Sequence, residues 1–423
     1  MRGWLRQAAG GLPRQFWFLW TGTLINRVGA FVVLFLSIYL TAERHFTQSQ
    51  AGLVLGLYGV GGAIGTMTGG VLADRWGRRP TMLLAQSGAA VLMLTLGLAE
   101  TFPQILAAAM LLGVFTEGVR PAFSAMMVDV VPERDRVRAY SLNYWAINLG
   151  FALAAVAAGL AAQADYFLLF AIDAGTTLVT ATITLLFLAE TRPAHRHTGH
   201  TPPGGMLTVL RDRVFLVFLL LNLASVLVMM QHTSTLPITM LADGLSAATY
   251  GWVIAVNGVM IVLGQLFIPR LVGAHDVSRV LAVGVLIIGV GFGLVAVAGP
   301  AWTFAATVIV WTFGEMLQSP SNATLIAALS PPSLRGRYQG LNSLSWSIGT
   351  ALAPILGGLV LQGLGGTALW VGCFTLCAIA AAGQLLAAPA RARRAALSGT
   401  PVVSAPPPVP PATSPDLSPA STP

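Results

Sequence analysis

The sequence GGVLADRWGRRP, residues 69–80, decides how the rest of this chain is interpreted. Its glycine-rich apolar run stops at Asp74, and three arginines follow within five residues. If the apolar run crosses a bilayer, this string is a tight turn, and the bias of arginine toward the cytoplasm places it on that side. The topology of the whole chain can be counted outward from this turn.

The composition excludes an ordinary soluble protein. Hydrophobic residues make up 55% of the chain and charged residues 9%, whereas soluble domains have roughly 25% charged residues. We therefore expect an all-α integral membrane protein. The basic residues are all arginines and lie at intervals in loops, so the net charge of +8 predicts no nucleic-acid-binding face. Cys373 and Cys377 are too few for a disulfide framework and are expected to pack in the interior.

Apolar stretches long enough to cross a membrane, about 20 residues each, recur in two groups of six. The first group is 16–40, 50–73, 81–99, 102–130, 141–162 and 166–189. The second group is 214–240, 249–269, 280–298, 302–328, 340–362 and 367–388. These groups predict an N-terminal six-helix bundle over 16–189 and a C-terminal one over 214–388, joined by a polar linker over 190–213. Residues 1–15 are an expected cytoplasmic N-terminus, and the Pro-rich tail over 389–423 is expected to be disordered.

The arginines test this count independently. Twenty of the 23 fall before the first stretch, in alternate loops, in the linker or after the last stretch, and the opposite side has only Arg44. This bias predicts a multi-pass protein of the cell membrane with both termini in the cytoplasm. The two remaining arginines, Arg27 and Arg120, fall inside apolar stretches.

An internal repeat supports two equivalent halves. A shift of 199 residues aligns one loop and the start of the next stretch with their later copies: Pro132, Arg136, Arg138, Leu142, Asn143, Gly150 and Gly159 fall on Pro331, Arg335, Arg337, Leu341, Asn342, Gly349 and Gly358. The alternative is coincidence in Gly-rich sequence. A parallel repeat predicts twelve transmembrane helices in two bundles around a central cavity, which is typical of transporters.

The turn also carries a family signature. Its residues match the G-x-x-x-D-R-x-G-R-R motif between the second and third helices of major facilitator superfamily transporters, and the matching residues are Gly70, Asp74, Arg75, Gly77, Arg78 and Arg79. The chain resembles this family over about residues 15–390. The resemblance implies a latch that stabilises the outward-facing state, with Asp74 near the start of the eleventh helix and an arginine paired to Asp129. The alternative is that these arginines only set the topology.

Polar residues inside apolar stretches are the main candidates for function, because a charge at mid-depth costs about 2.5–3.5 kcal/mol on insertion scales. They lie in the first, fourth, seventh and tenth stretches: Asn26, Arg27, Glu117, Arg120, Gln231, His232 and Glu315. The resemblance implies that these four helices line the central cavity. Asp173 is expected to be a packing or interfacial residue. Gly61, Gly65 and Gly69, spaced four apart, predict close helix contact.

Two interpretations of the charged residues remain open. Glu117 with Arg120, and Arg27 with Glu315, could form static neutral pairs, which contribute little to stability. Alternatively, a carboxylate that binds a proton loses its charge, releases its arginine and lets the cavity close on another ligand state. Aromatic and amide residues suit a large, partly apolar substrate, and those expected at the cavity are Trp145, Asn148, Asn257, Trp311 and Trp346.

The function predicted from the sequence is proton-coupled export of a small organic molecule. Here the chain is similar to bacterial multidrug and metabolite exporters, and we expect a monomer in the lipid bilayer without a cofactor or metal. One alternative is a proton-coupled importer of a nutrient or small peptide on the same fold. A receptor or membrane enzyme is disfavoured, because the sequence has no metalloprotease, nucleotide-binding or nucleophile-elbow motif.

Overall fold

The structure, a computed structural model, describes residues 10–191, 206–265, 267–273, 275–331 and 334–397, and these residues form helices joined by short turns. The N-terminal half contains α2 (Arg14–Val28), α3 (Val32–Ile38), η1 (Tyr39–Glu43), α4 (Gln48–Arg75), α5 (Arg78–Leu98), α6 (Phe102–Val130), η2 (Glu133–Asp135), α7 (Arg136–Ala164) and α8 (Phe167–Phe187). The C-terminal half contains α9 (Met206–Leu210), α10 (Arg213–Met229), α11 (Gln231–Ser234), α12 (Leu236–Ala242), α13 (Ala247–Gly264), α14 (Ile268–Gly273), α15 (Val277–Leu294), η3 (Val295–Val297), α16 (Ala301–Leu329), α17 (Arg335–Leu364) and α18 (Gly366–Leu397). Most of the predicted linker, and the predicted tail beyond residue 397, lie outside the described residues.

The predicted all-α membrane fold is confirmed. In the described part of the chain, eleven spans are long and apolar enough to cross a membrane. The predicted span that is not among these eleven is the tenth, α16, which at 29 residues is long enough but carries Glu315, Gln318 and Asn322. These polar residues lower its hydropathy, as is typical of a helix that lines a polar cavity.

The two halves repeat each other closely. The six long helices α10, α13, α15, α16, α17 and α18 each begin 199 residues after α2, α4, α5, α6, α7 and α8 respectively. Even the internal prolines of α6 and α16, Pro121 and Pro320, are related by this shift. The repeat predicted from one loop therefore extends to every long helix.

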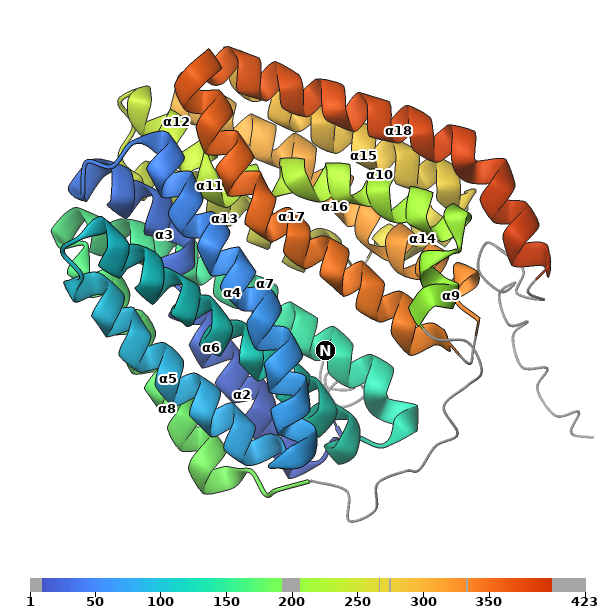
Figure 1. The fold of residues 1–423 in the computed structure, drawn as a ribbon, viewed down its shortest axis with the longest axis horizontal. Helices are drawn as coiled ribbons and strands as arrows, with labels where there is room; N and C mark the ends of the chain where they lie inside the picture. Colours follow the sequence, from blue (N-terminus) through green and yellow to red (C-terminus); the bar gives the residue numbers. More distant parts are fainter. Residues whose placement is uncertain (1–9, 192–205, 266, 274, 332–333, 398–423) are drawn as a thin grey trace, which may run out of the picture.

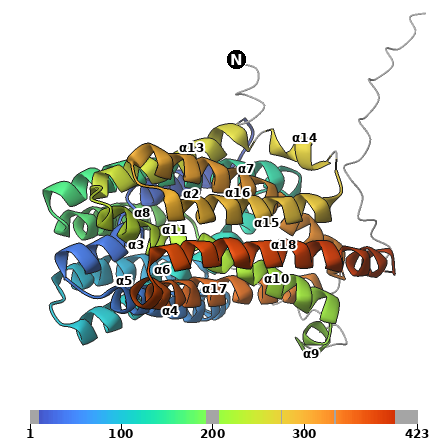
Figure 2. The same cartoon turned by 90° about the horizontal axis from the view of Figure 1, so that it is seen from above.

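The two halves touch along two helix pairs, α4 with α17 and α7 with α13. These pairs lie on opposite faces of the molecule (Figure 2). Close contacts of α4 with α17 involve Gly52 and Gly59, and those of α7 with α13 involve Gly159 and Gly251. Figure 1 shows α4 and α17 together at one end and diverging toward the other. α4 and α17 are therefore in contact at one end of the molecule and separated at the other.

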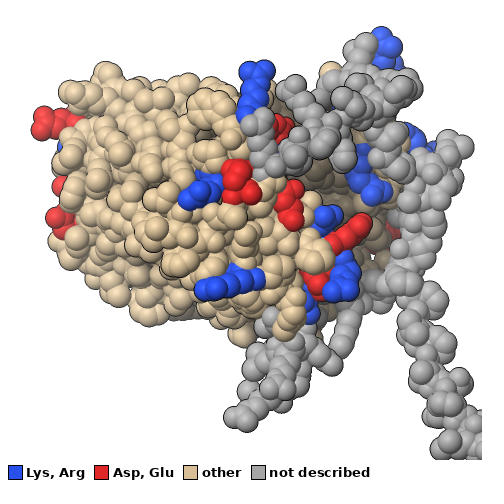
Figure 3. Space-filling view, turned by 90° about the horizontal axis from the view of Figure 1, so that it is seen from below, with Lys and Arg blue, Asp and Glu red and all other residues tan. Residues whose placement is uncertain are grey.

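The end at which α4 and α17 separate is rich in arginine. Arg14, Arg75, Arg136, Arg213 and Arg335 begin or finish helices there, and we call it the arginine-rich end. Charged side chains of both signs gather toward one end of the surface in Figure 3, and much of the remaining face is uncharged. An uncharged belt of this kind is what a bilayer requires.

Inside the N-terminal half, α4 and α6 pack at backbone distance. A side chain at Gly61, Gly65 or Gly69 would overlap the carbonyls of α6 residues Met110, Val114 and Gly118. The prediction of close helix contact at these glycines is thus confirmed. In the C-terminal half, Cys373 and Cys377 are buried and unbonded, as predicted.

Candidate functional site

The N-terminal half holds a charged cluster on α2 and α6. Arg120 Nε lies 2.6 Å from Glu117 Oε2, and the Arg120 side chain is 58% exposed in the absence of a membrane. Arg27 is within electrostatic range of both residues and of Tyr58. Gly62 of α4 packs against the Glu117 side chain, and an added Cβ would lie 2.9 Å from its Cγ. The structure thus brings together the three charged residues predicted in the first and fourth helices.

Arg27 lies just before a break in the first span. Between α2 and α3 the helix is interrupted, and the Val32 N–H donates to Asp173 Oδ2 of α8 over 3.1 Å. Asn26 donates to Thr177 of α8 over 3.0 Å. Asp173 of α8 is 3% exposed, and its carboxylate accepts from the backbone at the break between α2 and α3. It is therefore buried, as expected of a packing residue. The Asn26 side chain therefore points at α8, and this hydrogen bond uses one of the two N–H donors of its amide.

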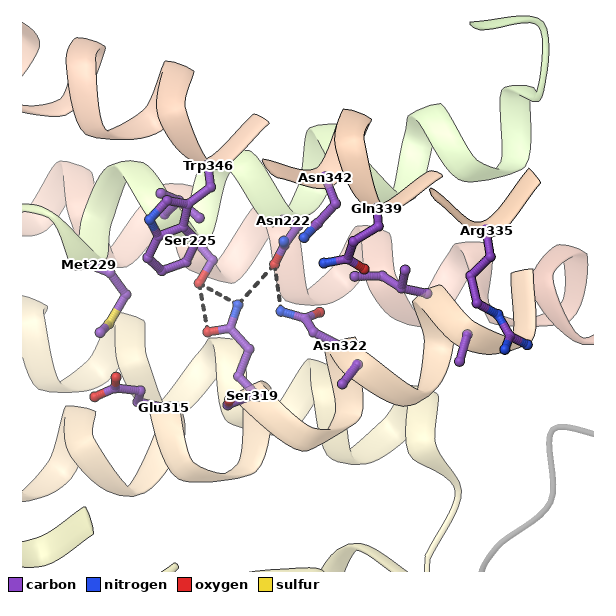
Figure 4. A pocket seen from close by; sticks show the side chains of 15 residues that line it. Asn222, Ser225, Met229, Glu315, Ser319, Asn322, Arg335, Gln339, Asn342 and Trp346 are labelled. Atoms are coloured by element: carbon purple, nitrogen blue, oxygen red, sulfur yellow. Dashed lines mark hydrogen bonds between the residues drawn. The ribbon is translucent and has the colours of Figure 1, made fainter. Parts of the chain in front are cut away.

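The C-terminal half holds a cavity of about 350 Å³ between α10, α16 and α17. Figure 4 shows Glu315 at one end, Arg335 at the other and a row of uncharged polar side chains between them. Uncharged polar side chains and one aromatic ring, that of Trp346, line the cavity wall. The polar residues are Asn222, Ser225, Gln318, Ser319, Asn322, Gln339 and Asn342. Because Arg335 begins α17, the cavity extends toward the arginine-rich end.

Glu315 is held by an amide and faces the other half. Asn257 of α13 donates from Nδ2 to Glu315 Oε2 over 2.9 Å and to Thr312 Oγ1 over 3.0 Å. Tyr144 of α7 lies within electrostatic range of Glu315. In the described part of the chain Glu315 has no ion pair, so the proposed static pair of Arg27 with Glu315 does not form here.

Two predicted cavity residues, Gln231 at the break in the seventh span and Trp311 in α16, are packed in the interior. Gln231 donates to the Leu227 and Ala353 carbonyls and accepts from Ser234 and Thr235, so its amide bridges α11 and α17. Trp311 is 1% exposed and stacks on Phe292. The expectation that these two side chains line the cavity is corrected: both complete the packing of the C-terminal half.

His232 lies where the two halves meet. Its Nδ1 is 2.6 Å from the Met229 carbonyl, and its ring centroid is 6.5 Å from that of Phe151 on α7. On the same helix, Asn148 donates to the Tyr144 carbonyl and is buried beside Gly258 of α13. Trp145 is 42% exposed and stacks on Trp20 of α2. Trp145 and Asn148 lie on α7, and none of the three residues lines the cavity between α10, α16 and α17.

The motif turn at the arginine-rich end is built around two carboxylates. Arg78 Nε donates to Asp129 Oδ2 over 3.1 Å, and Thr191 donates to the same oxygen over 2.9 Å. Glu190 accepts the backbone N–H groups of Arg78 and Arg79 over 2.9 and 3.0 Å, which caps the N-terminus of α5. Gly77 precedes them at φ 118°, a value that favours glycine, and a Cβ there would overlap the Glu190 carboxylate.

Asp74 of the same turn is solvent-exposed. Its side chain is 80% exposed and its nearest ionic partner is Arg78, 3.7 Å away. Arg75 ends α4, and Arg79 Nε donates to the Thr184 carbonyl over 3.4 Å. A Cβ added at Gly70 would lie 3.9 Å from Pro121 of α6. Asp74 lies in the last turn of α4, and the end of α4 is separated from the start of α17 in this conformation (Figure 1).

Sequence reasoning missed two groups of residues. The sequence analysis placed Glu190 at the start of the linker. An acid directly after a span is, however, also a candidate cap for the N-terminus of a neighbouring helix, and here it caps α5. The uncharged polar residues of α10, α16 and α17 were overlooked because only charged, aromatic and isolated amide residues were considered. Their signal was present, because Asn222 and Ser225, Gln318 and Asn322, and Gln339 and Asn342 are spaced three or four apart. The described residues contain no cluster that could hold a metal ion.

The sequence profile of the major facilitator superfamily matches this chain twice, over residues 19–242 and 218–413. The chain belongs to this superfamily. It is 27% identical over 386 residues to the uncharacterized MFS-type transporter YttB of Bacillus subtilis, covering 89% of this chain and 95% of YttB. It is 25% identical to a Na(+), Li(+), K(+)/H(+) antiporter of Planococcus maritimus, covering 76% and 83%, and 26% identical to the multidrug resistance protein MdtH of Salmonella arizonae, covering 81% and 85%.

Solved structures with the same fold are more distant in sequence. A POT family transporter in complex with a thioalcohol conjugated peptide superposes with a TM-score of 0.77 at 15% identity, over 91% of this chain and 98% of that one. A bacterial homolog of the human lysosomal transporter Spinster, solved in an inward-facing and unoccupied conformation, gives 0.74 at 15% identity, over 90% and 97%. At this identity the likeness concerns the fold alone. The present chain is therefore a membrane protein with two repeated bundles, as predicted.

Proposed function

We propose that this transporter exports a small organic molecule in exchange for protons, by alternating access between its two bundles. The observation that carries the proposal is the Glu117–Arg120 pair at 2.6 Å inside a membrane-spanning helix, because charges in spans are costly and are typical of ion pathways. Two relatives support it by name, since one is an antiporter of cations with protons and another a multidrug resistance protein.

The charged cluster supplies a coupling step. When Glu117 binds a proton it loses its charge, and the attraction that holds Arg120 beside it disappears. Arg120 is then free to reorient in the cavity, with Arg27 nearby. Glu315 is a second acid, held by Asn257 and facing α7 across the boundary between the halves. An inward proton that crosses about 100 mV supplies about 2.3 kcal/mol for the transition.

The topology and the latch belong to the same proposal. The arginine-rich end is cytoplasmic and the membrane is the cell membrane, because arginine-rich loops remain in the cytoplasm. The molecule then opens inward in this conformation, and Asp74 is free of α17. The latch forms when the halves close at this end and bring the α4 terminus to the start of α17. The unit of transport is the single chain, with protons and one small-molecule substrate as partners.

The proposal is tested with purified protein in proteoliposomes that enclose a pH-sensitive dye. A panel of tetraphenylphosphonium, ethidium and neutral glycosides is presented on one side, and the lumenal pH is recorded. We expect at least one compound to drive proton movement in the opposite direction in the native protein and in Glu100→Gln, whose acid lies in an exposed loop. Neither Glu117→Gln nor Glu315→Gln should do so. Proton movement in the same direction as the compound would favour the importer, and equal coupling in all variants would exclude these acids.

A further inference from the structure

The row of uncharged hydrogen-bonding side chains in the C-terminal half has no assigned role. It spans three helices: Asn222 and Ser225 on α10, Gln318 and Asn322 on α16, and Gln339 and Asn342 on α17. We call these six residues the amide row. Its side chains converge on the cavity of about 350 Å³ (Figure 4), a volume within the range of small-molecule sites.

Part of the amide row is bonded internally. Gln318 exchanges hydrogen bonds with Ser225 at 2.9 and 3.1 Å. Asn222 Oδ1 accepts from Gln318 over 3.2 Å and from Asn322 over 2.8 Å. These bonds join α10 to α16 and fix the orientation of four side chains, so this part of the wall is rigid.

Some hydrogen-bonding capacity of the amide row is left unused by the protein. Asn322 donates to Asn222, but its Oδ1 is buried and has no hydrogen-bond partner among the described residues. Asn342, which is partly buried, and Gln339, which is exposed, line the cavity and show no side-chain hydrogen bond within the described part of the chain. A buried acceptor without a partner calls for a donor from a ligand or a solvent molecule.

The repeat supports a specific role. In α6, which matches α16 in start, end and internal proline, the counterparts of Gln318 and Asn322 are the apolar Val119 and Phe123. The counterpart of Trp346 on α7 is Ile147. The fold therefore packs without an amide or a ring at these three positions in the N-terminal half, although Asn342 has an amide counterpart there, Asn143.

We propose that the amide row is the substrate-recognition site of the transporter, and that it takes an uncharged ring-containing molecule with several hydroxyl groups, as in a neutral glycoside. This inference rests on the proposed transport function. Carboxamides provide donors and acceptors side by side, which matches hydroxyl groups that both donate and accept. The Trp346 ring, 46% exposed, offers an apolar face beside them. Between Glu315 and Arg335 the wall carries no charge that would select an ion.

The test measures binding of phenyl glucoside, uridine and tetraphenylphosphonium to the purified full-length protein in detergent, by calorimetry. Phenyl glucoside or uridine should bind, and Asn342→Leu should weaken binding by about threefold to tenfold, the usual effect of one lost neutral hydrogen bond. Trp346→Leu should weaken it further and Trp346→Phe less. The control Asn143→Leu lies at the repeat-equivalent position of the other half and should leave the affinity unchanged.

The two proposals fail in different ways. If only tetraphenylphosphonium binds, or if Asn342→Leu and Trp346→Leu leave glycoside and uridine affinity unchanged, the amide row is not the recognition site, whatever the coupling. If the neutral probes bind as described but no compound moves protons in proteoliposomes, the recognition site stands and the proton-coupled function is wrong. Thermal unfolding of each variant verifies that its fold is intact, and a variant that unfolds is replaced by Asn342→Ser.

Discussion

The two halves of this transporter share one architecture but differ in the chemistry of their inner faces. Their long helices are related by a single shift of 199 residues. Yet the N-terminal half presents Arg27, Glu117 and Arg120, whereas the C-terminal half presents neutral amides with Glu315 at one end. The comparison suggests a division of roles, in which the N-terminal half carries the charged cluster and the C-terminal half recognises substrate and adds a second acid, Glu315. A repeat lets one copy change without the other, since the packing that holds each bundle lies outside the cavity.

The largest effect is expected from removing the titratable acids. Glu117→Gln and Glu315→Gln should each lower proton-coupled flux by at least about 100-fold, the scale of a lost positioned proton-transfer group. Glu100→Gln, the same chemical change in an exposed loop, should keep native flux. Dye-loaded proteoliposomes provide the measurement. If Glu117→Gln retained native coupling while Glu315→Gln lost it, charge handling would belong to the C-terminal half and the division proposed here would be reversed.

The packing of the two halves should respond differently to the same substitution. A Cβ at Gly65 would overlap the rigid Val114 carbonyl, whereas at the repeat-equivalent Gly264 it would meet the flexible end of Met316. Gly65→Ala should therefore lower the free energy of unfolding by about 1–3 kcal/mol, as overpacking does, and Gly264→Ala by much less. Thermal unfolding in detergent compares them. Equal losses would mean that the tight α4–α6 contact is not a special feature of the N-terminal half.

The Glu117–Arg120 pair can be tested for a purely static role. Arg120→Gln and Glu117→Gln should each cost about 1 kcal/mol of stability, because Arg120 is partly exposed and the pair is only partly desolvated. The double variant should recover much of that stability and still fail to couple. Unfolding and flux are measured on the same preparations in a double-mutant cycle. Restored flux in the double variant would mean that Glu117 and Arg120 only neutralise each other's charge and take no part in coupling.

The smallest effect is expected at the motif turn, which also exists in only one half. In the C-terminal half the equivalent turn has Asp276 as a helix cap that accepts the Arg279 N–H over 2.9 Å. Asp74→Asn should change the ratio of outward to inward conformations by about threefold to tenfold without loss of ligand binding, the range of a modest allosteric coupling. Spin labels on the arginine-rich ends of α4 and α17 report the distance. Identical distance distributions in the two proteins would exclude Asp74 from a latch.

Much of the fold was predictable because hydropathy, arginine bias and the repeat are long-range regularities that leave periodic traces in the sequence. The charged cluster of Arg27, Glu117 and Arg120 was predictable for the same reason, since a charge in an apolar stretch stands out. The direction in which a neutral side chain faces was not. Trp311 and Gln231 were assigned to the cavity from their helices alone, but Gln231 donates to the Ala353 carbonyl at the break in the seventh span, and Trp311 of α16 stacks on Phe292.

The amide row shows the opposite failure. Its residues are ordinary in composition and become significant only when three helices from different parts of the chain converge. The cap formed by Glu190 on α5 likewise joins residues more than one hundred positions apart. Such contacts depend on tertiary geometry, which no local pattern in the chain specifies.

The most direct test of the division between the halves is to measure phenyl glucoside binding and substrate-driven proton flux on two variants side by side. The account predicts that Glu117→Gln binds the glycoside with native affinity and moves no protons. It also predicts that Asn342→Leu binds more weakly but moves the native number of protons per substrate once saturated. Loss of binding in Glu117→Gln together with unchanged binding in Asn342→Leu would contradict it.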